Sequence, residues 1–219
     1  MTEWDDYWAK APKTHNRVYD RIAVFYRKYI IRPYLNRYFS RYFAGKGTIL
    51  HAGCGGGQVE EGIFDQGSVL GLDISINALS LYKRNHPKSD LVLGDIMTTG
   101  FRDRSFDGIY NLGVMEHFGK EEIHEILREF HRVLKTGGVI VLFWPPTYGA
   151  TVIVLKGVHF IFNSVLGKMI QLHPSEPSLI RSRNQAEEIA SRAGFRLRSY
   201  DFGIADLFTY AVLVMEKTD

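Results

Sequence analysis

Four glycines fall within five residues in the stretch TILHAGCGGGQVEE, at Gly53, Gly55, Gly56 and Gly57. Glycine inside a strand or helix costs ~0.5–1 kcal/mol relative to alanine, so a cluster this dense indicates a backbone that other residues cannot form. The cluster directly follows a short apolar run. A turn without side chains lets a ligand approach the main chain closely, so this loop is a candidate binding site.

Acidic residues stand at the ends of later apolar runs. Asp73 ends SVLGLD, Asp95 follows DLVLG, and Glu116 with His117 follows FDGIYNL by a few residues. A carboxylate about 20 residues after a glycine loop can accept hydrogen bonds from ribose hydroxyls, and Asp73 has that spacing from Gly53. The loop and Asp73 together predict a nucleoside ligand.

Apolar runs alternate with helix-like stretches, which predicts a parallel sheet with helices on both faces. The predicted strands are Thr48–Ala52, Ser68–Asp73, Asp90–Gly94, Phe106–Asn111, Val139–Trp144, Phe195–Asp201 and Leu207–Lys217. The predicted helices are Gln58–Asp65, Ser75–Asn85 and Lys120–Lys135, with another near Asn184. Because no helix separates the last two strands, we expect a C-terminal antiparallel hairpin.

The 219 residues, 45% of them apolar, suit one α/β domain. We therefore expect a single domain over 1–219. It has a basic N-terminal helical segment at 10–46, a cofactor-binding core at 47–144, a lid insertion at 145–182, and a C-terminal helix and hairpin at 183–219. Cys54 is the only cysteine, which excludes an internal disulfide and suits a reducing, cytoplasmic setting. The first residues lack the layout of a signal peptide.

Four blocks, in order, resemble the class I S-adenosylmethionine-dependent methyltransferases, closest by motif to small-molecule methylases of the ubiquinone-biosynthesis type. GCGGG resembles the family's glycine loop, and GDI at 94–96 resembles its adenine-contacting segment. SFDGIYNLGVMEHF at 105–118 resembles its fourth strand and following loop, and RVLKTGGVIVL at 132–142 its fifth strand. The dinucleotide fingerprint would instead need glycine where Gln58 stands. The resemblance implies a Rossmann-like, seven-stranded, mostly parallel sheet and S-adenosylmethionine as cofactor.

The resemblance also implies which residues contact the cofactor. They are Gly53, Cys54, Gly55 and Gly57 beside the methionine portion, Asp73 at the ribose, Ile74, Asp95 and Ile96 at the adenine, and Asn111 with Leu112 after the fourth strand. Asp95 has the alternative role of a turn residue at a strand end. His51 stands where the family usually has an acid that helps to anchor the ligand's ammonium. A neutral imidazole either accepts one hydrogen bond there or is satisfied within the strand end.

Glu116 and His117 are the candidate catalytic residues, because the loop that carries them faces the acceptor in the family. A base is needed only if the acceptor is a hydroxyl, an ammonium or an acidic carbon. The alternative is that both residues lie at the start of the next helix, where Glu116 meets its positive end. We expect no metal, since Gly113 replaces the first acid of the E-x-x-E-H motif of magnesium-assisted RNA-terminal methyltransferases.

Residues 10–46 carry ten Lys or Arg against one acid, in a chain of net charge +3. A helix over His15–Arg32 would place a basic edge beside an apolar stripe. The edge is Arg17, Arg21, Lys28 and Arg32, and the stripe is Val18, Ile22, Phe25 and Tyr29. The mostly apolar insertion Ala150–Ile170 has too many polar interruptions to span a membrane. Either these segments are a solvated face and a cover for the core, or they admit an acceptor from an anionic membrane surface.

The sequence thus predicts an enzyme that methylates a small or lipid-like acceptor, in the cytoplasm or peripheral to a membrane. RNA or protein is an alternative acceptor. The fourth strand ends in Asn111-Leu112-Gly113 and lacks the Asn/Asp-Pro-Pro-aromatic motif of base-amine methylases, so we do not expect nucleic acid as a partner. A nicotinamide-dependent oxidoreductase and a non-catalytic nucleoside-binding protein are the other classes left open.

Overall fold

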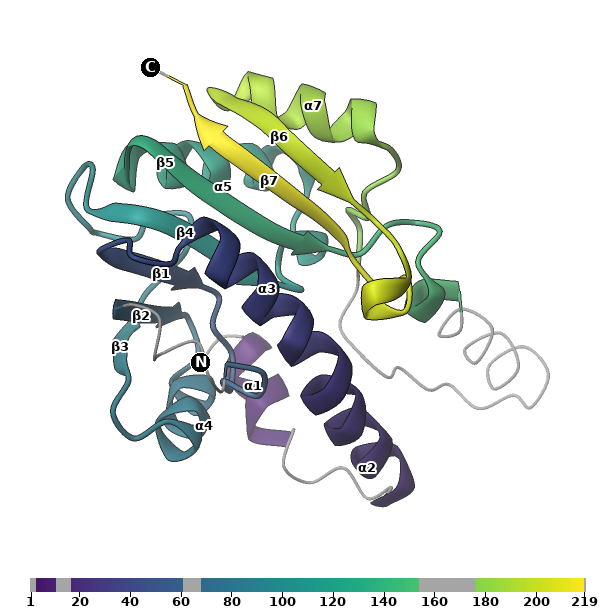
Figure 1. Cartoon of the computed structure of the whole chain (residues 1–219). Coiled ribbons are helices and arrows are strands. Elements are labelled where there is room, and N and C mark those ends of the chain that lie inside the picture. The colour runs from purple at the N-terminus through teal and green to yellow at the C-terminus, as the bar shows by residue number, and fades with distance from the viewer. Residues whose placement is uncertain (1–2, 11–16, 61–67, 154–175, 219) are drawn as a thin grey trace.

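The computed structural model of the chain describes residues 3–10, 17–60, 68–153 and 176–218. Within these residues a seven-stranded sheet has the order β3-β2-β1-β4-β5-β7-β6 (Figure 1). The strands are β1 Thr48–Ala52, β2 Ser68–Asp73, β3 Asp90–Leu93, β4 Phe106–Leu112, β5 Leu134–Trp144, β6 Phe195–Asp201 and β7 Ala211–Lys217. β1 to β5 pair in parallel, and β7 runs antiparallel to both β5 and β6. The predicted Rossmann-like sheet and its antiparallel hairpin are confirmed.

Helices cover both faces of the sheet (Figure 1). α3 (Arg32–Tyr42) packs on one face, where it buries Ile49 of β1 and Tyr110 of β4, and α4 (Ile76–Asn85) lies on the same side. α5 (Lys120–Val133) and α7 (Arg183–Arg192) bury the opposite face, including Leu50 and Ile109. Because successive side chains of a strand point to opposite faces of the sheet, the neighbours Ile49 and Leu50 pack in the hydrophobic clusters on opposite faces.

Local capping fixes the two helices that border the carboxyl ends of the strands. Ser75 accepts the N–H of Ala78 at 3.2 Å and caps α4. Glu122 accepts the N–H of Gly119 at 2.6 Å and caps α5. These hydrogen bonds fix the first turn of each helix, at Ser75 for α4 and at Gly119 for α5.

Several predicted boundaries were wrong. α5 ends at Val133, and β5 begins at Leu134 rather than Val139, because Leu134 is already extended (φ −80°, ψ 137°) and pairs with Phe106. β3 and β4 each differ from prediction by one residue at their ends. Within the predicted helix Gln58–Asp65, residues 58 and 59 form bends, residue 60 has no regular secondary structure, and the rest lies outside the described residues.

The predicted strand Leu207–Lys217 begins only at Ala211. Residues Ile204–Asp206 form the short helix η5, and Leu207 and Phe208 have left-handed φ angles of 57° and 58°. A left-handed residue cannot continue a ladder, so this segment forms an exposed loop before β7.

The predicted N-terminal helix is longer than expected. It consists of α2 (Arg17–Tyr26), the π-helical turn η2 (Arg27–Ile31) and α3. These elements run across the molecule in front of the sheet (Figure 1). Residues 15–16 of the predicted helix and residues 154–170 of the predicted insertion lie outside the described residues.

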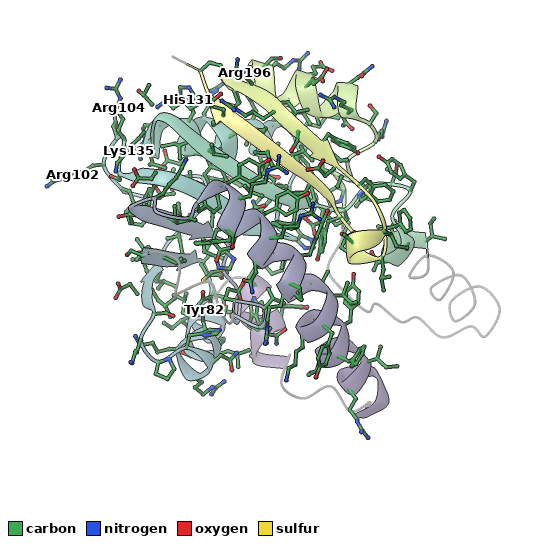
Figure 2. All side chains as sticks on the ribbon, viewed as in Figure 1. Tyr82, Arg102, Arg104, His131, Lys135 and Arg196 are labelled. Atoms are coloured by element: carbon green, nitrogen blue, oxygen red, sulfur yellow. The ribbon has the colours of Figure 1, made fainter. Side chains whose placement is uncertain are left out.

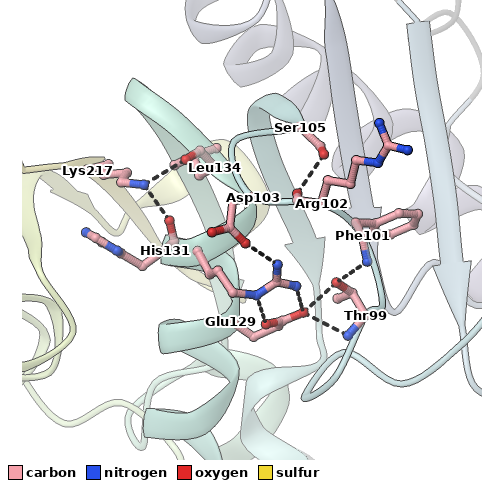
Figure 3. A network of polar contacts seen from close by, with 10 residues as sticks. Thr99, Phe101, Arg102, Asp103, Ser105, Glu129, His131, Leu134 and Lys217 are labelled. Atoms are coloured by element: carbon pink, nitrogen blue, oxygen red, sulfur yellow. Dashed lines mark hydrogen bonds and ion pairs between the residues drawn. The ribbon is translucent and has the colours of Figure 1, made fainter.

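The loop after β3 is held against α5 by a polar network (Figure 3). Glu129 Oε1 accepts the N–H of Thr99 at 2.9 Å and its hydroxyl at 2.6 Å. Arg132 bonds both carboxylate oxygens of Glu129 and also Asp103. These hydrogen bonds, together with the burial of Thr99, hold the loop that begins with Asp95 and Ile96.

Candidate active site

A cleft of about 860 Å³ lies at the carboxyl ends of β1, β2 and β4. In an open α/β sheet this edge is where ligands bind. The cleft is lined by most of the residues predicted from the sequence: Gly53, Cys54, Gly55, Gly57, Asp73, Ile74, Asp95, Ile96, Leu112, Glu116 and His117. The fold thus brings the glycine loop, the strand-end acids and the Glu-His pair to one site.

The glycine loop has the backbone that its composition predicts. Gly53, Gly55 and Gly57 have φ angles of 70°, 53° and 62°, in the left-handed region. The N–H groups of Gly53 and Cys54 both donate to the carbonyl of Leu72, at 2.8 and 3.0 Å. These bonds hold the loop against the end of β2, so the loop forms a fixed wall of the cleft.

Asp73 joins the glycine loop to the start of α4. Its Oδ2 accepts the N–H of Gly55 at 2.8 Å, and its Oδ1 accepts the N–H of Ser75 at 2.9 Å. Burial raises the pKa of Asp73, and these hydrogen bonds oppose that effect. Each carboxylate oxygen has a second lone pair, so Asp73 can also accept from a ligand.

The predicted adenine end lies between β2 and β3. Ile74 is partly exposed in the cleft and Ile96 is buried beside it. Asp95 Oδ1 accepts the N–H of Met97 at 2.9 Å. Asp95 therefore acts as a turn residue at the end of its strand, and it also lines the cleft.

Asn111 differs from the prediction. Its side chain is fully buried and does not line the cleft, which is reached by the next residue, Leu112. Neither the oxygen nor the nitrogen of the Asn111 amide has a hydrogen-bond partner among the described residues. Cys54 packs its buried thiol with Leu79 and Tyr82, and burial raises the pKa of this thiol.

Glu116 and His117 lie in a short helix, η3 (Met115–His117), and both line the cleft. Glu116 is buried, and burial raises its pKa to about 8. Its Oε1 is 3.9 Å from Nε2 of His117, and its Oε2 has no hydrogen-bond partner among the described residues. A buried carboxyl group without a full set of partners is a candidate proton acceptor.

The sequence analysis missed the first helix, α1 (Glu3–Lys10), which forms part of the cleft wall. A Cβ atom at Gly55 would lie 2.8 Å from the ring of Trp8, so this indole lies directly on the glycine loop. Asp5 Oδ1 accepts the hydroxyl proton of Ser75 at 2.7 Å. The signal available was the spacing of Trp4 and Trp8, which places both on one face of a helix.

Two further predictions concern metals and membranes. Among the described residues, no group of three or more His, Cys, Asp or Glu side chains could hold a metal ion. The helices in the described part of the chain are all too short or too polar to cross a bilayer.

Comparison with known proteins finds similarity to methyltransferases. Residues 50–142 match the family described as a methyltransferase domain. A demethylmenaquinone methyltransferase from Oceanobacillus iheyensis is 28% identical over 184 residues, covering 72% of this chain and 74% of the relative. An uncharacterized methyltransferase from Synechocystis is 32% identical over 109 residues, covering 45% of this chain and 51% of the relative. The chain thus aligns with about half the length of that second relative.

Two solved structures share the fold. A protein from Pyrococcus horikoshii has a TM-score of 0.64 at 18% identity, with both chains covered completely. A magnesium protoporphyrin IX methyltransferase from Synechocystis, solved with bound S-adenosylhomocysteine, has a TM-score of 0.64 at 17% identity, covering 94% of this chain and 89% of that one. The domain match over residues 50–142, the order of the sequence blocks and the fold agree in supporting an S-adenosylmethionine-dependent methyltransferase.

Proposed function

We propose that this chain transfers the methyl group of S-adenosylmethionine to a small apolar or lipid-like acceptor bound in the same cleft. The observation that carries the proposal is the continuity of the cleft: one cavity is lined by the glycine loop, by Asp73 and by Glu116. A donor and an acceptor held in one cavity can be aligned for direct displacement.

In this proposal the cofactor occupies the end formed by β1 and β2. The backbone of the glycine loop contacts the methionine portion, and Asp73 accepts hydrogen bonds from the ribose hydroxyls. Ile74 and Ile96 offer apolar surface to the adenine ring, beside Asp95. Leu112 lines the passage from the cofactor end to η3.

In this proposal the acceptor lies near η3, and the cleft also has apolar and aromatic lining side chains that could contact it. These are Trp4, Ile22, Tyr26, Phe118, Val152 and Tyr210. Such a surface favours an apolar acceptor with a ring over a charged polymer. The relatives whose names include demethylmenaquinone and magnesium protoporphyrin IX likewise favour a small-molecule acceptor.

The chemistry is an in-line displacement. A nucleophilic atom of the acceptor forms a bond to the methyl carbon while the bond from that carbon to sulfur breaks, and a neutral thioether leaves. When the acceptor atom carries a proton, the ionised carboxylate of Glu116 accepts that proton. His117, 3.9 Å from Glu116, is the alternative base.

The proposal is tested with S-adenosylmethionine labelled in its methyl group. The acceptors are a reduced naphthoquinone with a prenyl tail, the same ring without the tail, bulk RNA and bulk protein. We expect label in a ring compound and none in the polymers. Label only in RNA or protein would contradict the acceptor class, and failure to bind S-adenosylhomocysteine in calorimetry would contradict the cofactor site.

We also propose that the acceptor enters from an anionic membrane surface, because an apolar patch with basic neighbours lies beside the cleft. Ile22, Phe25 and Tyr29 of the predicted stripe are 63%, 61% and 55% exposed, so they do not pack on the core. Arg21 and Lys28 are exposed on the same helical segment. An amphipathic surface of this kind binds anionic bilayers through buried apolar area and charge attraction.

A further inference from the structure

A buried polar cluster lies beneath the glycine loop, at the floor of the cleft. His51 at the end of β1 stacks on Tyr110 of β4, with ring centroids 4.2 Å apart and planes 17° apart. Glu60, which follows the glycine loop, is 2% exposed and reaches the same place, so that its Oε1 is 3.7 Å from Nε2 of His51. His51 and Glu60 both line the cleft together with Gly53 and Gly55.

The hydrogen bonding of this cluster is incomplete among the described residues. Glu60 Oε2 accepts the N–H of Val59 at 2.8 Å, but the 3.7 Å between Glu60 and His51 is too long for a hydrogen bond. Nδ1 of His51 and the hydroxyl of Tyr110 have no hydrogen-bond partner in the described part of the chain. Buried polar groups are costly unless they are paired, so these atoms point to a ligand group.

The electrostatics of the cluster favour a cation. Burial lowers the pKa of His51 to about 3, so its imidazole is neutral and retains an acceptor nitrogen. Burial raises the pKa of Glu60 to about 7, while its hydrogen bonds and Arg32 lower it. A ligand cation placed beside Glu60 would favour the ionised carboxylate further.

The proposed function puts one primary cation at this point. The amino-acid portion of S-adenosylmethionine ends beside the glycine loop and carries an ammonium group, which has three donors and no acceptor. The related family supplies an acid at the position of His51, and this chain has none there. Among the described residues, Glu60 brings a buried carboxylate to within 3.7 Å of the imidazole of His51, whereas the carboxylate of Asp73 is hydrogen-bonded to Gly55 and Ser75.

We infer that Glu60, beside His51, binds the primary ammonium group of the cofactor's amino-acid portion and so replaces the missing strand-end acid. The inference rests on the proposed function. It assigns to Glu60 a contact with the cofactor and to His51 the role of a neutral positioning residue, held by stacking on Tyr110.

Calorimetry with two ligands tests this contact. The ligands are S-adenosylhomocysteine and its deamino analogue, which lacks only the amino group. For Glu60→Gln we expect the affinity for S-adenosylhomocysteine to fall about 10- to 100-fold, as for loss of a charge-assisted hydrogen bond, and the affinity for the analogue to stay within about 3-fold. Equal losses for both ligands, or no loss for either, would overturn the inference.

A second substitution, added to Glu60→Gln, provides a rescue experiment. In Glu60→Gln, the additional change His51→Asp returns a carboxylate to the strand end, and we expect it to restore most of the preference for S-adenosylhomocysteine over its analogue. A double variant that folds and binds but shows no recovery of this preference would count against a carboxylate–ammonium contact in the cluster.

The wild-type protein gives a test that needs no substitution. Between about pH 6 and pH 7.5 Glu60 ionises more fully, so the ratio of affinities for the two ligands should rise with pH. A ratio independent of pH would overturn the inference even if Glu60→Gln did not fold. If the wild type bound neither ligand at any pH, the proposed cofactor site itself would be wrong, which is a different result.

Discussion

The indole of Trp4 meets the imidazole of His117 edge to face, with 5.0 Å between the ring centroids. One turn further along α1, Trp8 lies against the glycine loop. The first helix therefore touches both the proposed cofactor end and the proposed acceptor end of the cleft. Its Asp5 is hydrogen-bonded to Ser75, next to Asp73. Movement of α1 would change access to both ends together.

Asp5→Ala should loosen α1 without unfolding the core. The buried bond from Ser75 to Asp5 is lost, so we expect faster dissociation of S-adenosylhomocysteine and an affinity lower by about 3- to 10-fold, which is the range for one hydrogen bond. Stopped-flow quenching of tryptophan fluorescence measures the rates.

Ser75→Ala is the comparison for this change, because Ser75 also caps α4 by accepting the N–H of Ala78. It should show the same faster dissociation together with about 1 kcal/mol of lost stability. Identical dissociation rates in Asp5→Ala and wild type would show that α1 does not control access.

Asp73→Ala should weaken cofactor binding by roughly 10- to 150-fold, equivalent to ~1.5–3 kcal/mol for a charge-assisted hydrogen bond. The structure adds a second effect, because Gly55 and Ser75 lose the acceptor of their N–H groups. We therefore expect a lower free energy of unfolding even without ligand. Calorimetry of S-adenosylhomocysteine binding and urea denaturation separate the two effects, and a folded variant with unchanged affinity would remove Asp73 from the site.

Gly55→Ala should damage the glycine loop more than a typical glycine substitution. Gly55 has a φ of 53°, which costs an L-residue roughly 1–2 kcal/mol, and the new Cβ would lie 2.8 Å from the ring of Trp8. We expect S-adenosylhomocysteine affinity to fall at least about 10-fold.

Gly203→Ala is the matched control for Gly55→Ala. Gly203 has an extended backbone with φ 177°, and no atom lies within 4 Å of an added Cβ. The affinity of Gly203→Ala for S-adenosylhomocysteine should equal that of the wild type. Normal binding by Gly55→Ala would mean that the loop is structural only and does not need close contact with a ligand.

The sheet could be predicted from the sequence because its strands are short apolar runs, most of them bounded by Gly, Asp or Asn, and short runs with such flanking residues are typical of buried strands. The left-handed backbone of Gly53, Gly55 and Gly57 was likewise implied by composition. The contacts between residues far apart in the sequence could not be predicted in this way. Nothing local to Trp4 or Asp5 indicates contact with His117 or Ser75, which lie far along the chain.

Local patterns also failed where a tertiary contact decides the outcome. Asn111 follows the family pattern, but its side chain alternates into the core on the α5 side of the sheet. The fifth strand begins early because Leu134 pairs with Phe106, although the glycines at 137 and 138 favour a helix end there. Glu60 falls in a region predicted as helix, but its backbone is not helical, and its carboxylate lies 3.7 Å from His51.

The membrane proposal predicts binding to anionic vesicles that weakens with salt, since charge attraction is screened over ~10 Å at 0.1 M. Arg21→Glu with Lys28→Glu should abolish sedimentation with such vesicles. The control is Arg102→Glu with Arg104→Glu, the same charge change on exposed residues that lie away from α2 (Figure 2). Equal sedimentation of both variants, or none by the wild type, would leave a soluble acceptor.

Glu116→Gln should change stability in a pH-dependent way. The pKa of Glu116 is about 8 in the folded chain, against ~4.3 for an unperturbed glutamate. Between these values the folded protein holds a proton that the unfolded chain has lost. The free energy of unfolding therefore falls with rising pH, by about 1.4 kcal/mol per pH unit from this group. The stabilisation is complete below about pH 4 and is lost as pH approaches 8.

Glutamine cannot ionise, so the difference in free energy of unfolding between Glu116→Gln and wild type should grow from about pH 5 to pH 8 and then level off. Glu60, which also titrates in this range, is present in both proteins and cancels. A difference independent of pH, measured by urea denaturation, would show that Glu116 is not held protonated.

The same ionisation should act on catalysis in the opposite direction. If Glu116 accepts the acceptor's proton, it must be charged, so kcat should rise with pH through about 8 while stability falls. In Glu116→Gln we expect kcat to be lower by about 100-fold or more and this rise to disappear, because a positioned base contributes 10²–10⁴-fold. A rise that persists in Glu116→Gln would transfer the role of base to another group, with His117 at 3.9 Å the nearest candidate, and His117→Ala would then remove it.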